Sequence, residues 1–294
     1  MLIARLIADP ATLETRLDAT VAALKVEGIA LAEATMLDAC SEVLQLALPG
    51  ADADVLRRVL DAHFPGSDGL IARDEIRVPD VFVSDMDSTM IGQECIDELA
   101  DFAGLKPQIA AITERAMQGE LDFAEALRER VGLLAGLDEG AIATCLADRI
   151  RPMEGARALV ATLKHRGCRT VLVTGGFHHF ADPVAANLGF ERVVANRLAV
   201  SEARLTGGLV GGITDSSVKA RVLAEEAEVA GKGAVTLATG DGANDIPMLQ
   251  EATYGVAFRA KPKARSAANG WIDRGDLTSL LKLLDIPERD WVAA

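Results

Sequence analysis

The chain of 294 residues is poor in aromatic side chains, in basic residues and in long hydrophobic runs. Aromatic residues make up 4% of a sequence that is half hydrophobic, so aliphatic side chains must fill most of the core. Lys and Arg number 30 against 44 Asp and Glu, which gives a net charge of −14 and argues against a nucleic acid or an anionic membrane as partner. A small anionic substrate stays compatible, because the charge inside a pocket can oppose the net charge.

Cysteine is also scarce. The four cysteines, Cys40, Cys95, Cys145 and Cys168, form no Cys-x-x-Cys pair, and their spacing fits no zinc site. We expect them to be reduced and mostly buried, which suits the cytoplasm. The first ten residues are charged and unlike a signal peptide, and no stretch of about 18 uncharged apolar residues predicts a membrane span. We therefore expect a cytoplasmic protein.

Two short apolar runs end in acidic clusters. Residues 81–84 are followed by Asp85 and Asp87, and residues 236–239 are followed by Gly240 and Asp241. Strands that end this way place carboxylates at the carboxyl edge of an open α/β sheet, where ligands bind. A polar turn that caps the next helix would explain either cluster alone. If the two strands are neighbours, the clusters together predict an oxygen-ligand site for Mg²⁺.

This pattern predicts phosphoryl chemistry. Asp85 would attack the phosphorus of a phosphate ester and form an aspartyl-phosphate. Asp87 would protonate the leaving alcohol and then accept a proton from the hydrolytic water. Asp241 would complete the Mg²⁺ site together with Asp85 and the backbone carbonyl of Asp87, since Mg²⁺ needs few protein ligands.

Five further residues carry candidate roles. Thr174 and Gly175 would bind phosphate oxygens near the start of the next helix, although a plain strand-to-helix turn would look the same. Lys219 would neutralise the phosphate and hold the nucleophile, whereas most lysines on helices are solvated. Asn244 would donate a hydrogen bond to the phosphate. Asp245 would hold Lys219 or a metal-bound water from behind.

The order of the predicted elements divides the chain into three parts. Residues 1–77 read strand-helix-strand-strand-helix-strand, with the last strand over 70–78, which predicts a small ferredoxin-like α+β domain. Residues 78–91 and 151–294 alternate strands and helices, which predicts a doubly wound, mostly parallel α/β sheet. Its strands are expected over 81–84, 169–174, 193–195, 235–238 and, last, 254–257, with a hairpin over 198–210. Residues 92–150 read as short helices, inserted as a cap that covers the site.

The motifs carry a family resemblance. Asp85-Met86-Asp87-Ser88-Thr89, Thr174-Gly175-Gly176-Phe177, Lys219 and Gly240-Asp241-Gly242-Ala243-Asn244-Asp245 occur in the order of the haloacid dehalogenase-like hydrolases. Residues 90–100, 114–123 and 127–131 are similar to the helical cap of the phosphoserine phosphatases, and residues 195–198 and 260–263 also resemble that family. The resemblance covers about residues 78–285.

The resemblance implies Mg²⁺-dependent hydrolysis of O-phospho-L-serine, the last step of serine biosynthesis. It also implies that Glu94 faces the substrate ammonium, that Arg130 binds the substrate carboxylate, and that Met117 and Phe123 close the pocket. Thr174 stands where many members carry serine; the hydroxyl is kept, and the β-branch is expected to tighten the phosphate pocket.

Several alternatives are open at this point. The same chemistry could act on another small phosphate ester such as phosphohomoserine, or transfer the phosphoryl group to another alcohol. A phospho-acceptor signalling module is a third reading, against which the acid/base residue and the cap argue. Residues 1–77 resemble regulatory modules fused to some relatives, and serine binding, formation of a homodimer and stabilisation of the chain are all open roles for them.

Overall fold

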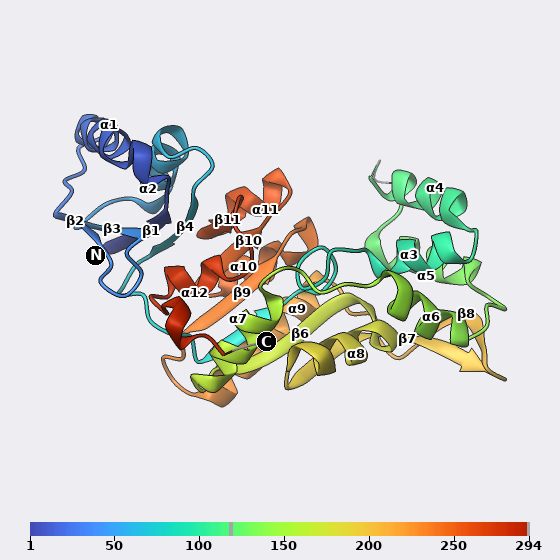
Figure 1. Cartoon of the computed structure of the whole chain (residues 1–294). Helices are drawn as coiled ribbons and strands as arrows, with labels where there is room; N and C mark the ends of the chain where they lie inside the picture. The colour runs from blue at the N-terminus through green and yellow to red at the C-terminus, as the bar shows by residue number, and fades with distance from the viewer. Residues whose placement is uncertain (118–119, 293–294) are drawn as a thin grey trace.

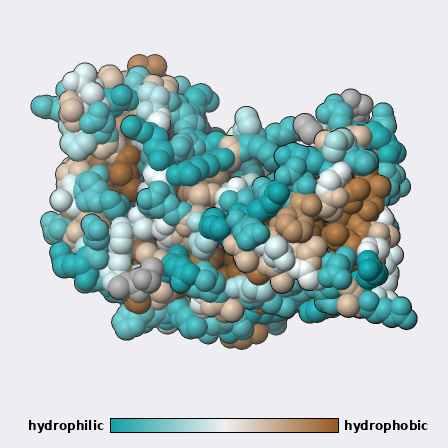
Figure 2. Space-filling view, turned by 45° about the vertical axis from the view of Figure 1, so that its right-hand side comes forward, coloured by the Kyte–Doolittle hydropathy of each residue, from teal (hydrophilic) through white to brown (hydrophobic). Residues whose placement is uncertain are grey.

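A computed structural model describes residues 1–117 and 120–292. In this part of the chain one sheet of 11 strands runs through the molecule in the order β2-β3-β1-β4-β11-β10-β9-β5-β6-β7-β8. The N-terminal unit lies at one end, the helical insert at the other, and the core sheet with its helices between them (Figure 1). The space-filling view shows a notch between the lobe that holds the N-terminal unit and the lobe that holds the insert (Figure 2).

The N-terminal unit has the predicted order of elements. It consists of β1 (Leu2–Ile7), α1 (Leu13–Val26), β2 (Glu33–Met36), β3 (Val43–Leu48), α2 (Ala53–His63) and β4 (Asp68–Ala72), and all its strand pairs are antiparallel. Alternate residues of β1, such as Leu2 and Leu6, pack with Leu24 of α1 and Leu56 of α2. The predicted last strand over 70–78 is wrong in its extent, because Ala72 pairs with Ile3 and β1 offers almost no backbone beyond that point.

The core confirms the doubly wound, mostly parallel sheet. Its parallel strands are β5 (Val81–Ser84), β6 (Arg169–Phe177), β7 (Arg192–Ser201), β9 (Thr236–Gly240), β10 (Tyr254–Phe258) and β11 (Gly270–Ile272). Its helices are α7 (Ala156–His165), α8 (His178–Leu188), α9 (Ser216–Ala230), α10 (Ile246–Glu251), α11 (Pro262–Ala267) and α12 (Ser279–Leu283). Phe82 and Val83 point into separate hydrophobic clusters, so both faces of β5 are buried, as in other parallel sheets.

The strand order places the ends of β5 and β9 side by side. Chain order runs outward from β5 through β6 and β7 on one side, and from β9 through β10 and β11 on the other. The connections therefore diverge at the carboxyl ends of these two strands. Such a switch point leaves a crevice where ligands bind in open α/β sheets.

The sequence reading missed β11. It took 254–257 as the last strand, whereas β11 follows it and pairs parallel with β10 and antiparallel with β4. A three-residue segment has no periodicity of its own, and it is a strand because partners hold it on both sides. Through this pairing the N-terminal sheet continues the core sheet. A domain boundary near residue 77 stays a prediction.

The predicted hairpin over 198–210 is present. Strand β8 (Arg204–Val210) pairs antiparallel with the end of β7, and Ser201 lies opposite Arg204. The two turn residues between them, Glu202 and Ala203, have φ of 50° and 60°, as a two-residue turn that matches strand twist requires. The backbone N–H of Gly136 donates to the carbonyl of Leu205 at 2.7 Å, so the hairpin supports the helical insert.

The insert consists of α3 (Cys95–Phe102), α4 (Lys106–Met117), α5 (Phe123–Leu133) and α6 (Gly140–Arg149). Its two connections to the core lie side by side: Ile91 forms a β-bridge with Pro152, and the N–H of Gly92 donates to the carbonyl of Arg151. The insert follows β5 directly and therefore stands over the carboxyl ends of the sheet. This arrangement confirms the predicted helical cap.

The cysteines agree with the expectation that they are reduced and buried. Cys40, Cys95, Cys145 and Cys168 are all buried with free thiols. Within residues 1–117 and 120–292, no helix combines the length and the apolar character that a membrane crossing needs.

Candidate active site

Asp85 lies at the crevice between β5 and β9. Its backbone N–H donates to the carbonyl of Thr239 at 2.9 Å, which ties the ends of the two strands together. The side chain is 4% exposed, and its Oδ1 accepts a hydrogen bond from the N–H of Met86 at 2.8 Å. In the part of the chain that the structure describes, no hydrogen bond to Oδ2 is recorded. Asp85 therefore presents one anchored and one free carboxylate oxygen.

Lys219 joins two buried carboxylates. It projects from the first turns of α9, a helix whose N-terminus is capped by the side chain of Asp215. Its Nζ lies 2.8 Å from Asp85 Oδ1 and 2.7 Å from Asp245 Oδ1, and the lysine side chain is 1% exposed. Burial alone would lower the pKa of Lys219, but the two carboxylates outweigh it and raise the pKa. The lysine is thus a fixed cation beside Asp85.

The two aspartates of the first motif have perturbed acidities. Burial, reinforced by Asp245, raises the pKa of Asp85 to about 7, and Lys219 limits the rise. Burial raises the pKa of Asp87 well above its usual range, and Glu94 and Asp85 add to that effect. Among the described residues, Oδ1 of Asp87 is buried without a hydrogen-bond partner. A raised pKa and a free buried oxygen suit a carboxyl group that donates a proton to a ligand.

Thr174 and the two glycines after it form an irregular stretch of β6 beside Asp87, where the pairing with β7 shifts its register. The hydroxyl of Thr174 accepts a hydrogen bond from the N–H of Gly176 at 3.0 Å. Asn196 fixes this stretch, because its Nδ2 donates to the carbonyl of Gly175 at 2.7 Å and its Oδ1 accepts from the N–H of Thr214 at 2.8 Å. The sequence reading assigned Asn196 no role, although it lies in a segment that resembles the family.

A cavity of about 250 Å³ lies between the cap and the sheet ends. It is lined by Asp85, Asp87, Glu94, Ile96, Phe123, Leu127, Arg130, Thr174, Gly175, Gly176, Phe177, Asp241, Asn244 and Lys261. Phe123 reaches across from α5 to the core, since a Cβ built on Gly175 would lie 3.1 Å from its Cζ. The cavity is therefore closed by the cap on one side and suits a small ligand.

Asp241 follows β9 and helps to form a cluster of oxygen donors. Carboxylate oxygens of Asp85, Asp241 and Asp245 all lie within 4.8 Å of one another. Asp245, fully buried, already accepts hydrogen bonds from Lys219 and from the N–H of Gly242. Asp85 and Asp241 are thus the pair with oxygens left to hold a metal ion, with Asp245 behind them.

The structure brings the predicted site residues together. Asp85, Asp87, Glu94, Phe123, Arg130, Thr174, Gly175, Asp241 and Asn244 line one cavity, and Lys219 and Asp245 lie directly behind Asp85. The side chain of Met117 lies outside the described residues. The roles assigned to these residues stay predictions. Ile96, Leu127 and Phe177 line the cavity without having been foreseen, because apolar positions in helices and turns carry no distinguishing sequence signal.

Comparisons with known proteins identify the family of the chain. Residues 82–250 match the profile of the haloacid dehalogenase-like hydrolases, and residues 221–282 match a second profile with the same description. The chain is 44% identical over 205 residues to a phosphoserine phosphatase of Albidiferax ferrireducens, which covers 68% of this chain and 86% of that protein.

Two solved structures are similar. A HAD family hydrolase from Salmonella enterica serovar Typhi has a TM-score of 0.83 and 27% identity, covering 96% of this chain and 98% of that chain. A phospho-aspartyl intermediate analogue of phosphoserine phosphatase has a TM-score of 0.63 and 36% identity, covering 70% of this chain and 99% of that chain. The chain therefore belongs to the phosphoserine phosphatase family of the haloacid dehalogenase-like hydrolases.

Proposed function

We propose that this enzyme hydrolyses O-phospho-L-serine to L-serine and phosphate through a phosphorylated Asp85. The observation that carries the proposal is one small cavity with Asp85 and Asp87 on its core side and Glu94 and Arg130 on its cap side. The first pair provides a nucleophile and an acid, and the second provides opposite charges for an amino acid. The curated relative named above carries the same activity in its name.

The first chemical step belongs to Asp85. Lys219 and the N–H of Met86 hold Oδ1, so Oδ2 is the oxygen free to attack phosphorus. The P–O bond to the seryl oxygen breaks as the bond to Asp85 forms, and that oxygen takes the proton of Asp87. Serine leaves as a neutral alcohol, and Asp85 carries the phosphoryl group.

The second step regenerates the enzyme. Asp87, now ionised, removes a proton from a water molecule that attacks the phosphoryl group from the side that serine has left. The bond between Asp85 and phosphorus breaks, inorganic phosphate is released, and Asp87 holds its proton again. The raised pKa of Asp87 suits both parts of this cycle.

The charges of the cavity fit a divalent cation. Besides Asp87, which carries the proton at this stage, its lining holds three carboxylates, Asp85, Glu94 and Asp241, against the cations Arg130 and Lys261, so a phosphate would meet a net negative field. Asp85, Asp241 and the backbone carbonyl of Asp87 would hold Mg²⁺, which prefers oxygen ligands. When bound, Mg²⁺ supplies positive charge that offsets the charge of the phosphoryl group.

The cap selects the amino-acid part of the substrate. Glu94 is oriented by the hydroxyl of Ser88, which donates to its Oε1 at 2.8 Å. Arg130 lines the cavity, and its Nε donates to the carbonyl of Ala126 on its own helix at 3.3 Å. A carboxylate could therefore bind Arg130 in a bidentate manner while Glu94 accepts the ammonium.

The test is phosphate release from O-phospho-L-serine, phosphothreonine and phosphohomoserine at equal concentration, with and without Mg²⁺. We expect rapid, Mg²⁺-dependent release that favours phosphoserine and is abolished by Asp85→Asn. Glu94→Gln should raise the KM for phosphoserine. Glu98→Gln is its control, because Glu98 lies on α3, the helix that Glu94 precedes, and pairs with Arg149 instead.

Two results would count against the proposal. Faster phosphate release from phosphohomoserine or phosphothreonine would show that the substrate is assigned wrongly, while the proposed reaction through a phosphorylated Asp85 would stand. Stable phosphorylation of Asp85 in the unmodified protein, with turnover unaffected by Asp87→Asn, would point to a phospho-acceptor module.

A further inference from the structure

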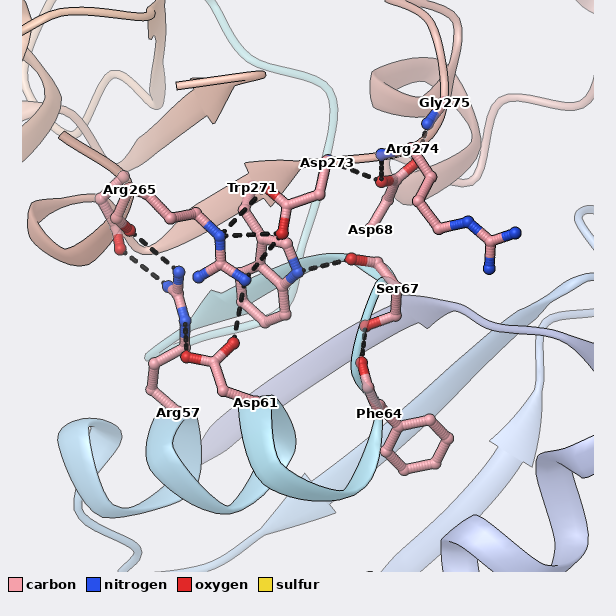
Figure 3. Close-up of polar contacts among 11 residues, drawn as sticks. Arg57, Asp61, Phe64, Ser67, Asp68, Arg265, Trp271, Asp273, Arg274 and Gly275 are labelled. Atoms are coloured by element: carbon pink, nitrogen blue, oxygen red, sulfur yellow. Dashed lines mark hydrogen bonds and ion pairs between the residues drawn. The ribbon is translucent and has the colours of Figure 1, made fainter. Parts of the chain in front are cut away.

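The N-terminal unit is joined to the core through Trp271. This residue lies on β11 of the core, is 1% exposed and packs in the hydrophobic cluster of the N-terminal unit. Its Nε1 donates to the carbonyl of Ser67 at 2.7 Å (Figure 3). No space is left around the ring on that side, since a Cβ built on Gly69 would lie 2.5 Å from its Cζ2. The two parts thus share one core.

A second contact reinforces this junction. Asp68 of β4 is 3% exposed and accepts hydrogen bonds from the backbone N–H groups of Asp273, Arg274 and Gly275, at 2.8 to 3.0 Å (Figure 3). The hydroxyl of Ser279 donates to it as well, at 3.0 Å. A carboxylate with four donors holds the loop after β11 in one position.

Arg57 of α2 binds the end of α11. Its two terminal nitrogens donate to the carbonyls of Arg265 and Ala268, at 2.9 and 3.0 Å (Figure 3 shows the first contact), and its side chain is 13% exposed. The last carbonyls of a helix have no partner within it, and a cation there also suits the helix dipole. The guanidinium lies 3.9 Å from the ring centroid of Trp271. The N-terminal unit thus supplies the C-terminal cap of this core helix.

The other end of α11 lies at the candidate active site. Lys261 is the residue before its first turn and lines the cavity. The N–H of Lys261 donates to the backbone carbonyl of Asp241 at 2.9 Å, and its Nζ lies 3.8 Å from the carboxylate. A helix of this length spans about 9 Å, so one short rigid element connects Arg57 with the loop of Asp241.

We propose that Arg57 is a positioning residue for the metal site, acting on Asp241 through α11. The inference rests on the proposed function, because that function assigns Asp241 to Mg²⁺. Arg57 and Trp271 fix the C-terminal end of α11, and the backbone of Lys261 at its N-terminal end fixes Asp241. The N-terminal unit is therefore part of the scaffold of the site, which goes beyond stabilising the chain.

The test compares Arg57→Gln with Arg58→Gln in the full chain. Arg58 is the matched control, because it lies on the same helix, is 64% exposed and pairs with Glu27 inside the N-terminal unit. Mg²⁺ binding is measured by titration calorimetry with MgCl₂ alone, beside thermal denaturation. We expect Arg57→Gln to weaken Mg²⁺ binding about fivefold, the lower end of typical coupling between sites. Arg58→Gln should leave it unchanged. Arg57→Lys should fall between them, since lysine cannot reach both carbonyls with a planar fork.

The outcomes of this test distinguish a failure of the inference about Arg57 from a failure of the proposed function. Unchanged Mg²⁺ affinity in a folded Arg57→Gln, even with a lower melting temperature, would overturn the inference and leave the proposed function standing. No Mg²⁺ binding by the unmodified protein would overturn both the metal assignment and the inference.

If Arg57→Gln does not fold, the inference is tested by hydrogen exchange in the unmodified protein. Coupling is reciprocal, so Mg²⁺ should slow exchange of the amides in residues 264–272 about fivefold. Equal exchange with and without Mg²⁺ would overturn the inference.

Discussion

Replacing Lys219 with Met tests the electrostatic reasoning about the site. The substitution keeps the length of the side chain and removes the one cation that contacts both Asp85 and Asp245, at 2.8 and 2.7 Å. Both carboxylates are almost fully buried. Removing one partner of a buried ion pair typically costs about 3–5 kcal/mol, because the remaining charge keeps its desolvation penalty. We expect a loss of this size in the free energy of unfolding at pH 8, together with loss of phosphatase activity.

The pH dependence of that loss is the sharper observation. Burial raises the folded-state pKa of Asp85 to about 7 while Lys219 is present, so its effect on wild-type stability is complete about one pH unit above that value. Without Lys219 the rise is opposed only by the N–H of Met86 among the causes named, and we expect the folded variant to keep a proton that the unfolded chain has lost. Its stability should therefore fall between pH 8 and pH 9 by about 1.4 kcal/mol per pH unit, whereas Asp85 adds almost no slope to the wild type there.

The assay is urea denaturation followed by circular dichroism at several pH values, with EDTA present to remove divalent cations. Arg221→Met is the control, since Arg221 lies on the same helix, is 63% exposed and pairs only with Glu225 among the described residues. Such a surface pair is worth at most about 1 kcal/mol. The reasoning would be refuted if Lys219→Met lowered the free energy of unfolding no more than Arg221→Met does and showed the same pH dependence as the wild type.

Three other substitutions test single contacts. Gly69→Ala places a Cβ 2.5 Å from Trp271, so we expect about 1–3 kcal/mol of destabilisation in urea, and a change below the error of that measurement would contradict the packing described. Asn196→Ala leaves the carbonyl of Gly175 and the N–H of Thr214 unpaired, which should lower the free energy of unfolding by about 2 kcal/mol and lower kcat/KM for phosphoserine. Unchanged kinetics would show that the backbone around Gly175 keeps its position without Asn196. In Gly175→Ala the new Cβ would lie 3.1 Å from Phe123 of the cap, so we expect KM for phosphoserine to rise about tenfold with little change in melting temperature. A clear drop in melting temperature would show that the substitution disturbs the core instead of the contact with the cap.

The order of elements could be predicted from the sequence because its signals are local. Apolar runs with glycine and acidic residues after them mark β5 and β9, and the alternation of strands with helices marks the core as an α/β sheet. The same locality explains how the candidate site residues were chosen: Asp85, Asp87 and Asp241 lie in short motifs at the ends of strands, and Lys219 lies in a motif at the start of α9. Their convergence on one cavity follows from a parallel sheet, whose strand ends share one edge.

What the sequence could not decide is how distant segments meet. Nothing in residues 270–272 predicts β11, because its strand character comes from pairing with β10 on one side and, on the other, with β4, about 200 positions earlier in the chain. For the same reason the sequence could not place Trp271 in the core of the N-terminal unit or Arg57 at the end of α11. Such contacts depend on complementary shape and on hydrogen-bonding groups that come together only in the folded chain. Local pattern thus determined the elements and the chemistry, and tertiary packing alone decided that the N-terminal unit supports the site.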